Sequence, residues 1–107
     1  MVVSIYMDME KLELQINGHA CSAEPGKDLV CCAVSILAES ISRYMERKEN
    51  SGDLEFLINE IQEGRVLIKA DPNKWDMKES KGAFEVVREG FRALANEYPE
   101  YITMEEE

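Results

Sequence analysis

The sequence is short of basic residues, has a single histidine and contains no long apolar run. Its 107 residues include 12 Lys and Arg against 22 Asp and Glu, which gives a formal net charge of −10. A surface this acidic repels phosphate, which argues against direct nucleic-acid binding and favours a basic partner. No stretch approaches the roughly 18 apolar residues of a membrane span, and residues 1–7 lack the basic start of a signal peptide. We therefore expect a cytoplasmic protein that does not bind a membrane.

Cysteine is present in an odd number, at Cys21, Cys31 and Cys32. An odd count argues against the disulfide framework of a small secreted domain. The sequence also contains no C-x-x-C motif of the kind that redox proteins use. In a reducing compartment the thiols are available as nucleophiles.

The length and the hydrophobic pattern predict one domain, residues 1–107, without internal repeats. Alternating apolar residues predict strands at 2–7, 12–16, 54–58, 66–68 and 101–104, and helical spacing predicts helices at 28–47 and 80–98. A polar loop at residues 18–27 precedes the first helix. The order ββαββαβ predicts an α+β fold, with two helices packed on one face of a mostly antiparallel sheet.

The most informative pair of residues is His19 and Cys31, which are separated by eleven residues. With Asp28 as the N-cap, Cys31 would lie in the first turn of the helix, where the helix dipole favours a thiolate. Amide groups of that turn could then stabilise an oxyanion. His19 could act as the general base, so the pair has the parts of a cysteine nucleophile with its base.

The phase of the same helix distinguishes the two adjacent thiols. The apolar stripe that we assigned to the core consists of Leu29, Ala33, Ile36 and Leu37. On a helical wheel Cys31 then points away from the core and Cys32 points towards it. This phase predicts that Cys31 is the accessible thiol and that Cys32 is a packing residue. We also expect Lys48 to lie on a solvated helix face and Trp75 to pack over a sheet edge.

From the residues alone, three classes of protein stay open. The pair can belong to a cysteine hydrolase, or it can be structural in a non-catalytic, homodimeric module that binds a basic protein. A small zinc-binding protein is the third class, with His19, Cys21, Cys31 and Cys32 as ligands. Adjacent Cys31 and Cys32 match the usual spacing of zinc ligands poorly.

Three stretches carry a resemblance to a known family: Gly18-His19-Ala20, Gly26-Lys27-Asp28-Leu29-Val30-Cys31 and Ala33-Val34-Ser35. They resemble the signature of the ribosomal-processing cysteine protease family Prp. The ending Tyr98-Pro99-Glu100-Tyr101 is also similar to that of the family. The resemblance spans the chain, although residues 44–80 match in pattern only.

The resemblance implies a cytoplasmic, homodimeric cysteine endopeptidase that needs no cofactor or metal. Its substrate would be the N-terminal extension of large-subunit ribosomal protein twenty-seven, a basic protein. Cys31 and His19 would be the catalytic pair, with Gly18, Asp28 and Ser35 in supporting roles. The loop at residues 18–27 would close over the peptide. With the resemblance in view, the non-catalytic alternative becomes a homodimeric, ribosome-associated binding module.

The sequence departs from the family pattern at two cysteines. Cys32 replaces a small alanine that we expect after the nucleophile, and Cys21 lies two residues past the histidine. Neither change removes a catalytic group. A disulfide between Cys21 and Cys31 would inhibit the enzyme under oxidation.

Overall fold

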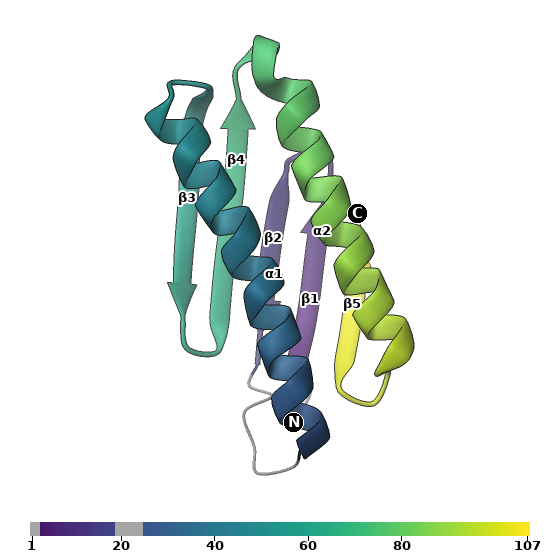
Figure 1. Cartoon of the computed structure of the whole chain (residues 1–107). Helices are drawn as coiled ribbons and strands as arrows, with labels where there is room; N and C mark the ends of the chain where they lie inside the picture. The colour runs from purple at the N-terminus through teal and green to yellow at the C-terminus, as the bar shows by residue number, and fades with distance from the viewer. Residues whose placement is uncertain (1–2, 19–24) are drawn as a thin grey trace.

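A five-stranded sheet forms one layer of the molecule and two long helices form the other (Figure 1). The computed structural model describes residues 3–18 and 25–107, with the backbone alone for residues 25–28. The elements in chain order are β1 (Val3–Asp8), β2 (Glu13–Asn17), α1 (Pro25–Asn50), β3 (Leu54–Gln62), β4 (Arg65–Pro72), the short 3₁₀ helix η1 (Lys74–Asp76), α2 (Met77–Glu97) and β5 (Ile102–Glu106). This order confirms the predicted α+β fold.

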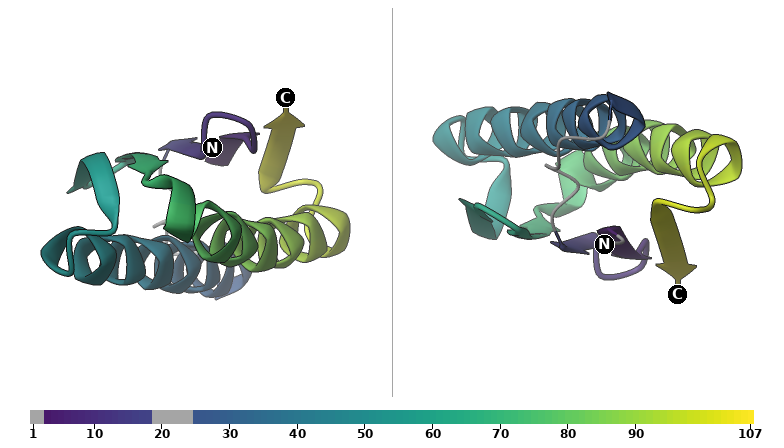
Figure 2. Two further views of the ribbon diagram at one scale, coloured as in Figure 1. Left: turned by 90° about the horizontal axis from the view of Figure 1, so that it is seen from above. Right: turned by 90° about the horizontal axis from the view of Figure 1, so that it is seen from below.

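The strands lie side by side in the order β3-β4-β2-β1-β5. All neighbouring pairs are antiparallel except β1 and β5, which are parallel, so the sheet is mixed and mostly antiparallel. Seen along the strands, both helices lie on the same face of the sheet (Figure 2). The strand β1 shows the reason: Val3, Ile5 and Met7 are buried on that face and alternate with the more exposed Ser4 and Tyr6.

The buried stripe of α1 differs from the predicted one. It consists of Val30, Val34, Ala38, Ile41 and Met45. In contrast, Leu29 and Ile36 are 68% and 61% exposed. The predicted phase of the helix was therefore wrong by about one residue, which is about 100° around the helix axis. The helix carries apolar side chains on more than one face, and only packing on the sheet selects the face that is buried.

Both helices begin earlier than predicted. α1 begins at Pro25 and not at Asp28, and α2 begins at Met77 and not near Ser80. Proline is favoured in the first turn of a helix because that turn has no intrahelical partner for a backbone N–H. Among the described residues, neither helix is long and apolar enough to cross a bilayer.

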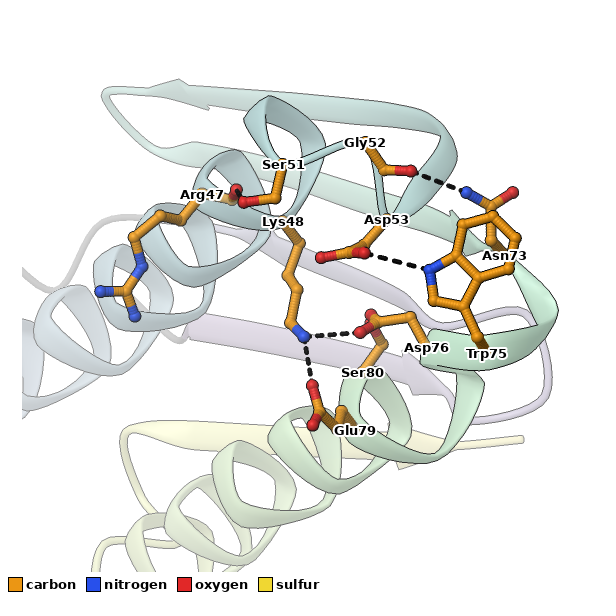
Figure 3. Close-up of polar contacts among 10 residues, drawn as sticks. All are labelled: Arg47, Lys48, Ser51, Gly52, Asp53, Asn73, Trp75, Asp76, Glu79 and Ser80. Carbon is orange, nitrogen blue, oxygen red and sulfur yellow. Dashed lines mark hydrogen bonds and ion pairs between the residues drawn. The ribbon is translucent and has the colours of Figure 1, made fainter.

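A polar network joins the end of α1 to the start of α2 (Figure 3). The Lys48 ammonium group lies 2.5 Å from a carboxylate oxygen of Asp76 and also contacts Glu79. Asp76 is buried and accepts a hydrogen bond of 2.6 Å from the Ser80 hydroxyl. The prediction of a solvated Lys48 was therefore wrong.

Trp75 does not pack over a sheet edge as predicted. Its side chain is 73% exposed, and its indole N–H donates a 3.1 Å hydrogen bond to Asp53 (Figure 3). The ring thus closes a surface contact between η1 and the turn that precedes β3. It contributes little to the core.

Candidate active site

A cleft of about 660 Å³ lies between α1 and the end of the β3–β4 hairpin. Gly18, which follows β2, also lines it. The helix contributes one wall, which carries Cys31, Val34, Ser35, Ala38, Glu39, Ser42, Arg43 and Glu46. The opposite wall consists of Ile61, Gln62, Glu63, Gly64, Arg65 and Val66. The cleft is thus apolar at depth and carries charges of both signs.

Cys31 lines this cleft, but not in the way that the sequence predicted. Its side chain is half-buried and packs against the hydrophobic core, whereas Cys32 is exposed and is absent from the lining of the cleft. The predicted orientations of the two thiols were therefore reversed. The reason is the phase of α1: because Val30 and Val34 face the sheet, Cys31 lies at the edge of the buried stripe.

The predicted N-cap was wrong as well. Because α1 begins at Pro25, Asp28 lies within the helix and Cys31 is its seventh residue. The backbone N–H groups without an intrahelical partner belong to the first four residues, and the dipole acts mainly in the first turn. Cys31 is thus beyond the helix start to which we had assigned its activation and the oxyanion site.

Gly18 links the cleft to the loop that follows β2. Its N–H donates a 2.9 Å hydrogen bond to the carbonyl oxygen of Gly64 in the β3–β4 turn. Gly18 has φ of 113° and Gly64 has φ of 78°, values that favour glycine. The bond continues the pairing of Asn17 with Arg65 by one residue. It fixes the position from which the chain continues to His19.

Ser35 lies one helical turn after Cys31 and lines the same cleft. The structure thus brings together three of the five predicted site residues: Gly18, Cys31 and Ser35. His19 and Cys21 lie outside the described residues, and so does the expected closing loop up to residue 24. Of Asp28 only the backbone is described.

The zinc hypothesis concerns residues of which only half are described. His19 and Cys21 are outside them, and Cys32 points away from the cleft that Cys31 lines. Among the side chains of residues 3–18 and 29–107, no three of His, Cys, Asp or Glu are grouped to bind a metal ion.

Sequence reasoning missed the second wall of the cleft. Ile61 and Val66 pair directly across the β3–β4 hairpin and face α1, and Ile61 is 48% exposed. On the helix, Arg43 forms an ion pair of 3.3 Å with Glu39. No local signal marks the hairpin residues, because they lie more than 25 positions from Cys31 and meet it only in the folded chain.

Comparison with known proteins identifies the family of the chain. The family model described as cysteine protease Prp matches residues 1–103. A curated relative, the ribosomal processing cysteine protease Prp of Mycoplasma genitalium, is 34% identical over 95 residues, which are 88% of this chain and 87% of the relative.

Solved structures share the fold at lower identity. A ribosomal processing protease Prp from S. aureus, crystallised with a substrate peptide, superposes with a TM-score of 0.69 at 18% identity and covers 99% of this chain and 98% of that one. A protein of Streptococcus mutans superposes with a TM-score of 0.67 at 24% identity, over 97% and 90% of the two chains. Matched by the family model over nearly its whole length and by a curated relative above 30% identity, the chain belongs to the cysteine protease Prp family.

Proposed function

We propose that this cysteine protease removes the N-terminal extension of large-subunit ribosomal protein twenty-seven, with Cys31 as nucleophile and His19 as base. The observation that carries the proposal is the position of Cys31 in a cleft of about 660 Å³ that Gly18 also lines. His19 follows Gly18 directly in the sequence, and we take it as the base that acts at this cleft. The volume suits a few residues of an extended peptide.

The chemistry follows from these two groups. Cys31 transfers its thiol proton to His19, and its sulfur attacks the scissile carbonyl carbon to form a tetrahedral oxyanion. The carbon–nitrogen bond then breaks, His19 gives the proton to the departing amine, and a thioester to Cys31 stays behind. Water, deprotonated by His19, hydrolyses the thioester and restores the thiol. Asp28 and Ser35 support the site, and residues 18–27 close over the peptide.

The relatives and the charge support this substrate. The relatives from Mycoplasma genitalium and S. aureus are named as ribosomal processing proteases. A net charge of −10 attracts a basic ribosomal protein, and the place of action that fits such a substrate is the cytoplasm.

We also propose that the protein is a homodimer, as the family resemblance implies. The helical layer exposes Leu29, Ile36 and Val86, which are 68%, 61% and 72% accessible in the single chain. Burying such side chains against a second copy would remove them from water. Sedimentation equilibrium at micromolar concentration should give twice the chain mass of 12.2 kDa. A monomer mass would contradict the dimer.

The two adjacent cysteines provide a matched pair of variants for testing the protease. We expect Cys31→Ser to lower kcat/KM by at least about a thousandfold, because it removes the nucleophile. Cys32→Ser should leave kcat/KM within about threefold, because Cys32 is exposed and outside the cleft. The measurement is the rate at which the product appears, identified by its mass, during incubation with the ribosomal protein that carries its extension.

Thiol labelling separates the protease from a non-catalytic binding module. Under the proposal, His19→Ala slows alkylation of Cys31 below pH 8 and leaves alkylation of Cys32 unchanged. No cleavage by the wild-type protein, or full cleavage by Cys31→Ser, would overturn the proposed function.

A further inference from the structure

Two side chains tie the walls of the cleft together. The Ser42 hydroxyl on α1 donates a 2.7 Å hydrogen bond to the side-chain oxygen of Asn59 on β3. The Asn59 amide group donates a second bond, of 3.2 Å, to the main-chain oxygen of Ser42. Ser42 is buried and lines the cleft. The pair therefore forms a reciprocal clip between the helix and the strand.

The clip matters more for the position of β3 than for the position of β4. β3 is the edge strand, so only β4 pairs with it in the sheet. β4 is paired on both sides, with β2 and β3, and its turn is bonded to Gly18. A loss of the clip would thus release the β3 part of the wall, where Ile61 and Gln62 lie, and would leave Gly18 in place.

We propose that Ser42 and Asn59 are positioning residues that set the width of the substrate cleft. The inference rests on the proposed function, since it takes the cleft to be the peptide site. Neither residue touches the reacting atoms: Ser42 lies eleven residues after Cys31, about 16 Å along the helix axis. The clip acts on substrate binding through the separation of α1 and β3.

The experiment compares steady-state kinetics of Asn59→Ala and Ser42→Ala with the wild-type protein. The probe is a fluorogenic peptide that spans the end of the extension of the ribosomal protein. We expect KM to rise about fivefold in Ser42→Ala, the effect of about one net hydrogen bond, and at least as much in Asn59→Ala, which removes both bonds. We expect kcat and the alkylation rate of Cys31 to stay within about twofold, because Gly18 keeps its bond to Gly64. A role in folding alone would not produce this split.

The chain offers its own controls. Ser40→Ala changes the same residue type on the same helix, but Ser40 is exposed and bonds only within the helix, to the Ile36 carbonyl. It should leave KM unchanged. Ser42→Thr keeps a hydroxyl donor and should restore a KM near that of the wild type. The double variant Ser42→Ala, Asn59→Ala should have the KM of Asn59→Ala, because that change alone removes both bonds, whereas Ser42→Ala removes only the bond from the hydroxyl.

Each outcome tests either the proposed cleavage activity or the role of the clip. A wild-type protein that does not cleave the peptide would overturn the proposed function, and this inference with it. An active Asn59→Ala protein with unchanged KM would overturn the clip alone. A fall in kcat equal to the change in kcat/KM would also overturn it, since the clip would then act on chemistry. Additive effects in the double variant would show that the two residues act separately.

Discussion

Asp76 is a buried carboxylate that depends on two partners. Its side chain accepts hydrogen bonds from Lys48 and from Ser80, and the residue is only 3% exposed. Burial by itself disfavours the charged form, but the bonds from Lys48 and Ser80 outweigh it, so the pKa of Asp76 lies below its usual range. In turn, the hydrogen bond to Asp76 raises the pKa of Lys48. The pair stays ionised at neutral pH.

The lowered pKa makes a pH-dependent contribution to stability. A carboxyl whose pKa is lower in the folded state stabilises the protein above its unfolded pKa, and the stabilisation disappears as pH falls through the folded pKa. We therefore expect Asp76→Asn to cost about 1.5–3 kcal/mol of unfolding free energy at pH 6, because it removes the buried carboxylate that bonds to Lys48 and Ser80 and leaves Lys48 only its contact with Glu79. The cost should shrink below about pH 4.

Urea unfolding at a series of pH values measures this difference. Asp71→Asn is the control, since Asp71 is exposed and its change should alter the unfolding free energy by less than about 0.5 kcal/mol. If Asp76→Asn lowered the unfolding free energy equally at pH 3 and pH 6, the lowered pKa of Asp76 in the folded protein would be contradicted.

At the scale of elements, two glycines on α2 have different surroundings. A Cβ atom built on Gly90 would lie 2.9 Å from a methyl carbon of Leu37 on α1, whereas one on Gly82 would have no neighbour within 4 Å. Gly90 thus lies where α2 approaches α1 closely. The Leu37 methyl group can shift, but it loses contacts when it does.

We expect Gly82→Ala to raise the free energy of unfolding by about 0.5–1 kcal/mol, because alanine is the better helix former. Gly90→Ala has the same gain in helix propensity but must displace Leu37, so its net gain should be smaller. Thermal and urea unfolding of the two variants provide the comparison. A larger gain for Gly90→Ala than for Gly82→Ala would show that the helices can separate at no cost.

The elements also show where prediction from sequence ends. The types and order of the elements could be predicted, because each has its own apolar period. The boundaries could not: α2 and η1 begin in a polar segment with no apolar period, and β5 continues through Glu105 and Glu106. The predicted strand ends at residue 104, but pairing with β1 and the bonds from Arg92 to Glu106 extend it.

At the scale of the whole molecule, the net charge of −10 dominates the long-range interactions. Attraction between this surface and a basic ribosomal protein is screened by salt. We expect kcat/KM for the whole ribosomal protein to fall about three- to tenfold between about 50 and 300 mM NaCl. A short, uncharged peptide that spans the cleavage site should show a change of less than about twofold. Equal salt dependence for both substrates would exclude a role of the surface charge.

The order of strands and helices and the layered fold could be predicted from the residues, and the family resemblance implied that Gly18, Cys31 and Ser35 belong to one site. These follow from periodicity and from a short motif, which are local properties of the chain. The folded chain showed that Cys31 is half-buried in the cleft beside the core and that Cys32 is exposed, the reverse of the predicted orientations. It also supplied the second wall from β3 and β4. The physical reason is that α1 has apolar side chains on several faces, and its phase is set by burial against the sheet, which no local pattern contains.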